Sequence, residues 1–137
     1  MGSKSCMEQG STREITRIYL AVPYSGRESY AFKTASEFSG VLFSEGYHVF
    51  SPVSHSHPIA VMGPEGLSEK DADFWLDFDL PLLHGWADEL WVLMNEGWQR
   101  SYGVAKEIEL AYRLGMPVRY ARYLGDGCYT VSDRPVG

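Results

Sequence analysis

The chain alternates between short β-rich runs and longer stretches with helical periodicity, and this alternation limits its fold more than any other feature. The β-rich runs lie at residues 15–22, 47–51, 89–94 and 118–123, and a short fifth strand is expected at 128–131. Strands that alternate with helices predict a mostly parallel sheet with helices on both faces. We therefore expect a single-domain, doubly wound α/β fold of the flavodoxin-like or Rossmann-like kind, with four or five strands.

Apolar spacing and terminal signals predict three helices. The first covers about residues 28–45, and the third covers about 102–114. The second begins with the capping sequence at 68–71, and Pro81 is expected to bend it or to end its regular part. Residues 53–66 show little periodicity, so we expect a long loop there.

Composition excludes several classes of protein. The formal net charge is −6 and no basic run is present, which argues against binding nucleic acid through its phosphates. No apolar stretch approaches the ~18 residues that cross a bilayer. Cys6 and Cys128 form no CxxC pair and look like free thiols. We expect a cytoplasmic protein without a cofactor, with a disordered leader at 1–14, one domain at 15–131 and a tail at 132–137.

Polar loops follow three of the predicted strands, after Val22, Ser51 and Met94, and they contain nearly all the chemically interesting residues. In open α/β sheets, ligands bind at the carboxyl ends of the strands. Free backbone N–H groups at a helix start also favour an anion. The sequence therefore predicts a binding site for a small molecule at this edge of the sheet.

The first of these loops contains Tyr24, Ser25, Gly26 and Arg27. Gly26 permits a positive φ or a close backbone approach, and Ser25 with the helix start could hold a phosphate or a sugar hydroxyl. Arg27 adds a positive charge. The alternative is a simple turn with Ser25 as the helix N-cap. No Walker loop or GxGxxG is present, so neither an NTPase nor a dinucleotide-dependent dehydrogenase is supported.

The second loop carries His55 and His57. Two imidazoles are too few for a metal site without a third ligand, which Asp71 or Asp73 could supply, and we expect no metal. Alternatively, His57 lines a pocket, where it stacks on a base or donates a hydrogen bond. The remaining interpretation is that both are exposed loop residues without a role.

Two carboxylates are candidates for catalysis. Asp79 lies among leucines near the end of the second helix, where burial could raise its pKa, whereas Asp73 and Asp77 share another face. Glu107 lies in the first turns of the third helix and borders its buried face, so its carboxylate can point toward the loop that precedes this helix. An acid there also suits the helix dipole, which is the structural alternative. Glu109 is expected to be solvated.

These elements, in this order, resemble the nucleoside 2-deoxyribosyltransferase-like superfamily, and most of all its compact bacterial and phage branch of unassigned function. The resemblance covers roughly residues 15–121, and its most specific element is the Gly-x-x-x-Glu-Ile-x-x-Ala pattern that starts at Gly103. It implies that Glu107 is the nucleophile that attacks the anomeric carbon and that Asp79 assists the departing base. Tyr24, Ser25 and Gly26 would shape the pocket for sugar and base.

The resemblance also bears on the ligand. The transferase branch usually carries an acid six residues before the nucleophile, where this chain has Ser101, and the related 5′-monophosphate N-glycosidases look serine-bearing there. This implies a nucleotide rather than a free nucleoside, with the phosphate held by Ser25, Ser101 and the Gly103 backbone beside Tyr102. A homo-oligomer, such as a dimer, is implied as well. The chain departs from the pattern at Glu109, where the transferases have Gly, and in its His-Ser-His-Pro loop.

The chemistry expected from these residues is cleavage of an N-glycosidic bond through a carboxylate nucleophile, by hydrolysis or by transfer of the base. His57 could replace Asp79 as the proton donor. The competing interpretation is a nucleotide-binding or sensing module that kept the fold and lost catalysis. A weaker one is a metal-dependent hydrolase that uses His55, His57 and an Asp.

Overall fold

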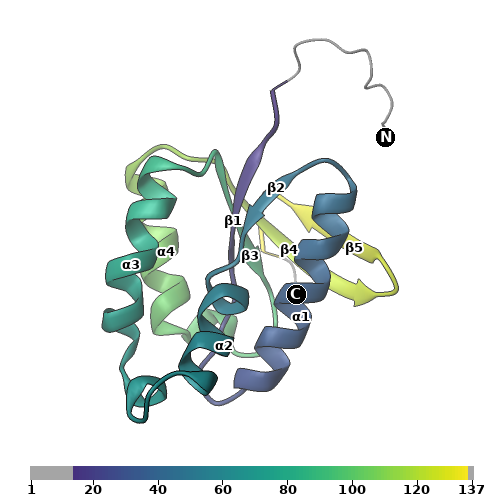
Figure 1. Ribbon diagram of the computed structural model, residues 1–137. Coiled ribbons are helices and arrows are strands. Elements are labelled where there is room, and N and C mark those ends of the chain that lie inside the picture. The colour runs from purple at the N-terminus through teal and green to yellow at the C-terminus, as the bar shows by residue number, and fades with distance from the viewer. Residues whose placement is uncertain (1–13, 136–137) are drawn as a thin grey trace.

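A computed structural model describes residues 14–135 and confirms the doubly wound α/β fold (Figure 1). One five-stranded sheet has the order β2-β1-β3-β4-β5, in which the first four strands are parallel and β5 runs antiparallel to β4. The strands are β1 (Arg17–Ala21), β2 (His48–Phe50), β3 (Glu89–Leu93), β4 (Val118–Gly125) and β5 (Cys128–Ser132). This is the flavodoxin-like strand order, whose switch point lies between β1 and β3.

Helices cover both faces of the sheet (Figure 1). They are α1 (Glu28–Ser44), α2 (Pro52–Met62), α3 (Ala72–Gly85) and α4 (Tyr102–Arg113), with short 3-10 turns η2 (Leu67–Glu69) and η3 (Trp98–Arg100). Ile18 and Leu20 of β1 pack against α1, whereas Tyr19 and Ala21 face α3 and α4. Because β1 is buried on both faces, it reads as a continuous apolar run rather than an alternating one.

The long loop predicted at 53–66 is wrong, because most of this segment forms α2. The hydroxyl of Ser51 accepts a hydrogen bond from the amide of Ser54 at 3.1 Å, and Pro52 occupies the first turn, so the helix has a strong start. Pro58 removes one backbone hydrogen bond from its interior. Val53 and Ala60 are buried, so the helix packs against the rest of the fold despite that loss.

The start of α3 differs from the prediction, and of the two effects expected of Pro81 the early end of the helix is wrong. Asp71 is the N-cap, since its carboxylate accepts from the amide of Phe74 at 3.1 Å, and Ser68 lies in the separate turn η2. Pro81 does not end the helix, which continues to Gly85. The remaining strand and helix boundaries agree with the sequence-based ones within two residues.

Two expectations fall largely outside the described residues, namely the leader at 1–14 and the thiol of Cys6. Cys128 is free and exposed. No helix within residues 14–135 is long and apolar enough to cross a membrane. The division of the chain into leader, domain and tail stays a prediction.

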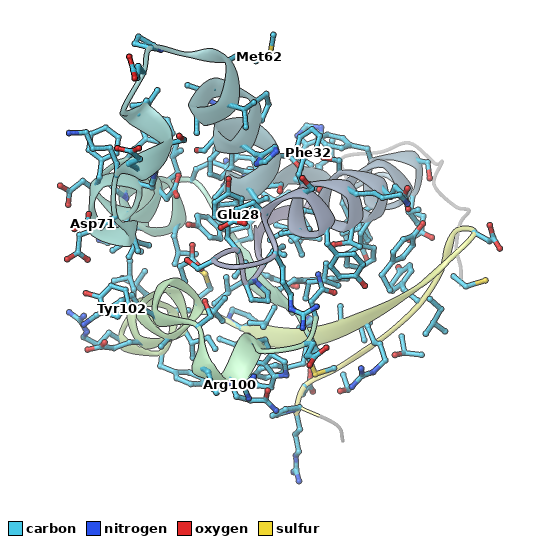
Figure 2. All side chains as sticks on the ribbon, turned by 90° about the horizontal axis from the view of Figure 1, so that it is seen from below. Glu28, Phe32, Met62, Asp71, Arg100 and Tyr102 are labelled. Carbon is cyan, nitrogen blue, oxygen red and sulfur yellow. The ribbon has the colours of Figure 1, made fainter. Side chains whose placement is uncertain are left out.

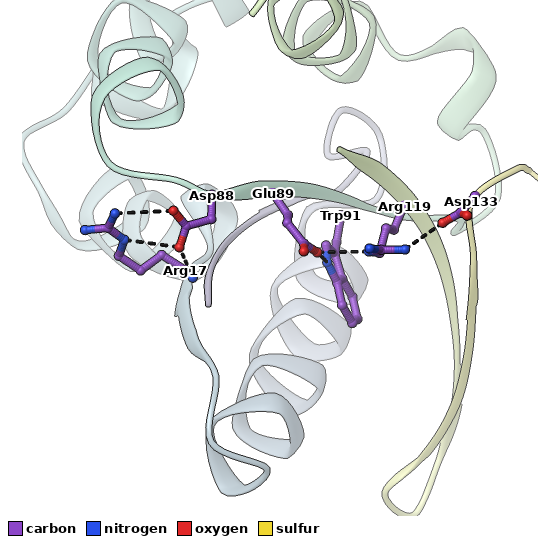
Figure 3. Close-up of polar contacts among 6 residues, drawn as sticks. All are labelled: Arg17, Asp88, Glu89, Trp91, Arg119 and Asp133. Carbon is purple, nitrogen blue, oxygen red and sulfur yellow. Dashed lines mark hydrogen bonds and ion pairs between the residues drawn. The ribbon is translucent and has the colours of Figure 1, made fainter. Parts of the chain in front are cut away.

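Ion pairs tie the strands together at their amino ends (Figure 3). Arg17 at the start of β1 pairs with Asp88 at 3.3 Å. On the neighbouring strands, Arg119 contacts Glu89 at 3.0 Å and Asp133 at 2.6 Å. The indole of Trp91 donates to the same Glu89 oxygen at 2.9 Å. These contacts link β1, β3, β4 and the end of β5 at the edge opposite the predicted site.

Candidate active site

The predicted site residues gather at the carboxyl edge of the sheet. Figure 2 looks onto this edge and shows Glu28 and Phe32 of α1 on one side, with Asp71 and Tyr102, at the starts of α3 and α4, on the other. The loop after β1 and the loop after β3 flank the switch point between these strands. The topology therefore places these residues at the edge where open α/β sheets bind their ligands.

Glu107 is buried in the second turn of α4, and only 5% of it is exposed. The phenol of Tyr19, at the centre of β1, donates a hydrogen bond of 2.5 Å to its Oε2. Burial raises the pKa of Glu107 to about 8, the hydrogen bond from Tyr19 opposes that rise, and the charge of Asp79 adds to it. The expected position of Glu107 on the buried face of the helix is confirmed.

Asp79 faces the same space from α3, and 5% of it is exposed. Burial raises the pKa of Asp79 to about 7. Its Oδ1 is buried and has no hydrogen-bond partner within the described part of the chain. Burial also raises the pKa of Tyr19, to which the charges of Glu107 and Asp79 contribute. The three groups thus form one cluster between β1, α3 and α4.

The acid pair of Asp79 and Glu107 cannot easily carry two negative charges in this buried place. The cluster therefore favours the state in which one carboxyl is ionised and the other retains its proton, and its titration belongs to the pair. One carboxylate that can attack and one acid that can donate a proton are the two groups needed to break a glycosidic bond. Perturbed pKa values of this kind gather at catalytic sites.

The two histidines of α2 face different neighbours. His57 accepts or donates a 2.8 Å hydrogen bond between its Nδ1 and the hydroxyl of Tyr24, and its ring stacks on Phe32 at 4.9 Å between centroids. His55 instead stacks on Phe78 of α3 at 5.3 Å. In residues 14–135 no group of three or more His, Cys, Asp or Glu side chains is arranged to hold a metal ion.

The loop after β1 is held by carboxylates. Gly26 has a φ of +84°, as its predicted freedom requires, and its N–H donates to Oε2 of Glu28 at 2.9 Å. The guanidinium of Arg27 lies 3.1 Å from Oε1 of Glu96, in the loop after β3. The alternative with Ser25 as N-cap is wrong, because Arg27 takes that position without a side-chain hydrogen bond and Ser25 is exposed.

The loop after β3 leads into α4 through η3. Ser101 caps the helix by accepting from the amide of Val104 at 3.2 Å, and Gly103 lies in the first turn. The hydroxyl of Tyr102 donates to Asp73 at 2.9 Å. Asn95 donates to the hydroxyl of Thr34 on α1 at 2.9 Å, which fixes the start of this loop.

Sequence reasoning missed Tyr19, Glu28 and Glu96. In the sequence, Tyr19 is one more residue of a buried strand. The signal of its role is its hydroxyl, because a buried hydroxyl needs a hydrogen-bond partner and its neighbours Ile18 and Leu20 are apolar. Glu109 is exposed as expected, and it pairs with Arg113 at 3.7 Å. The ligand-binding roles of the first and third loops stay predictions.

A family described as a domain of unknown function (DUF1937) matches residues 16–122, which include every element of this site. The chain belongs to the DUF1937 family. Among solved structures, this DUF1937 chain is similar to a 2-deoxyribosyltransferase from the psychrotolerant bacterium Bacillus psychrosaccharolyticus, with 30% sequence identity and a TM-score of 0.54 over 75% of this chain and 69% of that one. The relationship to the 2-deoxyribosyltransferases is therefore confirmed.

A conserved protein from Enterococcus faecalis V583 shares the fold, with 22% identity and a TM-score of 0.54. The match covers 77% of the DUF1937 chain and 62% of that protein, so the chain spans less than two thirds of its length. No curated protein is significantly similar to this chain in sequence.

Proposed function

We propose that this protein cleaves the N-glycosidic bond of a nucleoside or a nucleoside 5′-monophosphate, by hydrolysis or by transfer of the base. The observation that carries the proposal is the buried pair of carboxyls on α3 and α4, Asp79 and Glu107, each with a raised pKa. The similarity to a 2-deoxyribosyltransferase supports it, since that enzyme transfers a deoxyribosyl group.

In the proposed first step, the carboxylate of Glu107 attacks the anomeric carbon of the sugar. The electron pair of the glycosidic bond passes to the base, which takes a proton from Asp79, and a glycosyl-enzyme ester remains. In the second step, water or another base attacks the same carbon and releases Glu107, while Asp79 accepts the proton of the incoming group. Hydrolysis and transfer differ only in which molecule arrives.

Tyr19 positions the nucleophile in this proposal. A hydrogen bond to a carboxylate stabilises its ionised form, so the phenol keeps Glu107 more acidic than burial alone would allow. His57, Tyr24, Ser25, Gly26 and Arg27 would contact the substrate from the first loop and α2. Ser101, Tyr102 and Gly103 would contact it from the start of α4. His57 is the alternative proton donor.

The test is to incubate the protein with nucleosides and nucleoside 5′-monophosphates and to measure the free base by chromatography. Glu107→Gln should abolish base release, because an amide cannot form the glycosyl ester. Glu109→Gln is the matched control on the same helix, and it should leave turnover unchanged because Glu109 is exposed. Base release that survives Glu107→Gln would remove Glu107 from the mechanism.

A second candidate is a nucleotide-binding module without catalysis. The raised pKa of Glu107 favours it, since a carboxyl with a pKa of about 8 is mostly protonated at neutral pH and is then no nucleophile. This candidate predicts saturable binding without turnover, and binding that survives Glu107→Gln.

The proposed homo-oligomer is tested by light scattering coupled to size-exclusion chromatography.

A further inference from the structure

The strand β5 lies at one edge of the sheet (Figure 1). Within residues 14–135 it pairs with β4 alone, so every second residue of β5 directs its backbone N–H and C=O away from the sheet. Proteins protect such an edge with charged side chains, with proline or by keeping the strand very short. The opposite edge strand, β2, has three residues, whereas β5 has five, of which none is charged and none is a proline. The edge of β5 is therefore open to a further strand.

The side chains of β5 also leave room for a neighbour. Tyr129 packs on the ring of Phe38 in α1, with 5.0 Å between the centroids. Val131 lies on the same face of the strand as Tyr129, because side chains alternate between the two faces. It is 39% exposed although it is apolar, and Thr130 on the other face is exposed as well. An added strand would cover these side chains.

We propose that β5 pairs with β5 of a second copy of this chain, antiparallel and across a two-fold axis at Thr130. The two five-stranded sheets then continue into one another. A two-fold axis makes the contact self-complementary, since each residue that faces a second residue is faced by that same residue in return. The proposal assigns a surface to the homo-oligomer and does not depend on the chemistry proposed for the site.

The side-chain pairs select this register. With the axis at Thr130, the two threonines face each other and Tyr129 faces Val131 of the second copy. Pairs of threonines, and pairs of an aromatic with a β-branched residue, both stabilise antiparallel sheets. An axis at Tyr129 would place Val131 opposite Gly127, and an axis at Val131 would place Tyr129 opposite Asp133. Either shift loses the apolar pair.

Charges at the two ends of the strand favour the same register. Asp126 lies in the turn before β5 and Arg134 lies just after it, and the axis at Thr130 brings each one opposite the other in the second copy. Both are exposed, and neither side chain has an ion-pair partner within residues 14–135. Asp133, the other charge at this end, already pairs with Arg119 at 2.6 Å. The second copy thus supplies the missing partner of both charges.

Sedimentation velocity on charge variants of Thr130 tests the pairing. The wild type should be a dimer. Thr130→Lys places two like charges opposite each other at the axis, so we expect the dissociation constant of the dimer to rise by about tenfold or more. Thr130→Glu should have the same effect. An equimolar mixture of the two variants places an ammonium opposite a carboxylate and should restore the dimer.

Ser68→Lys is the matched control, because it adds the same charge at an exposed position in η2. It should leave the dimer unchanged. Thermal denaturation of each variant checks that it is folded. A monomeric wild type, a Thr130→Lys variant that dimerises as the wild type does, or a mixture of folded variants that stays monomeric would overturn the proposal.

Disulfide formation tests the register without a charge at the axis. The proposed pairing places Ser132 opposite Cys128 of the second copy, within the reach of a disulfide. In a Cys6→Ser background, Ser132→Cys should therefore give a covalent dimer on a non-reducing gel after treatment with oxidised glutathione. The background alone should not, because the two copies of Cys128 are not opposite each other. Ser68→Cys in the same background is the control for random collisions.

A Ser132→Cys variant that links no more than the Ser68→Cys control would overturn the register. None of these measurements needs turnover. Their outcome therefore stays separate from that of the base-release assay, which tests the proposed function.

Discussion

Tyr19 and Glu107 are 88 residues apart in sequence, yet the phenol of one donates to the carboxylate of the other at 2.5 Å in the buried centre of the molecule. The contact joins the central strand β1 to α4 and places the oxygen of Glu107 in a fixed direction. Its partner across the cluster is Asp79, whose charge acts on both groups.

Tyr19→Phe removes the hydrogen bond and keeps the ring. The pKa of Glu107 should rise further, because the hydrogen bond that opposes the effect of burial is lost. We expect kcat at pH 7 to fall about 10- to 100-fold, since each pKa unit costs a factor of ten in ionised nucleophile. The acid limb of the pH–rate profile should move to higher pH. Tyr112→Phe, which loses a hydroxyl contact with Tyr120, is the control, and an equal loss there would assign the effect to packing.

Activity should follow a narrow bell-shaped pH profile with its maximum between about 7 and 8, set by the pair rather than by either residue. Below the maximum, Glu107 gains a proton and stops being a nucleophile. Above it, Asp79 loses the proton that the base requires. Asp79→Asn removes the proton donor, so it should lower kcat and abolish the alkaline limb. A profile that is flat from pH 5 to 9 would contradict these roles.

Stability should also depend on pH through the same two carboxyls. Their folded-state pKa values are raised, so the folded state is fully stable below the ordinary carboxyl range and loses stability as pH rises toward 8. Glu107→Gln removes one buried charge. The change that it causes in the free energy of unfolding should therefore be more stabilising at pH 9 than at pH 4, by about 2–4 kcal/mol. Urea denaturation at both pH values measures this. Exposed Glu109→Gln should show no such difference.

The cap of α3 is a separate source of stability. Asp71→Ala removes the carboxylate that accepts the amide of Phe74, so we expect a loss of about 1 kcal/mol in the free energy of unfolding. Asp77→Ala, at an exposed position inside the same helix, should change stability much less. Equal effects in thermal denaturation would show that the cap contributes nothing specific.

Periodicity predicted the five strands and three of the helices, because each buries a regular apolar face. It missed α2, whose apolar residues gather at the two ends of the helix instead of forming one regular face, and whose start depends on the local cap at Ser51. It found Asp79 and Glu107, because an acid among apolar neighbours is visible in the sequence. It could not find Tyr19 or the pairing of Arg27 with Glu96, because contacts between distant segments depend on the register of the folded sheet.

The ion pairs shown in Figure 3 lie at the amino edge of the parallel strands, whereas the residues proposed to touch a ligand lie at or beyond the carboxyl edge. The proposed chemistry and these ion pairs are thus at opposite edges of the sheet. That separation makes the surface around Arg17 and Asp88 the natural point for tethering the protein to a solid support or fusing a reporter, with the proposed site left facing the solution.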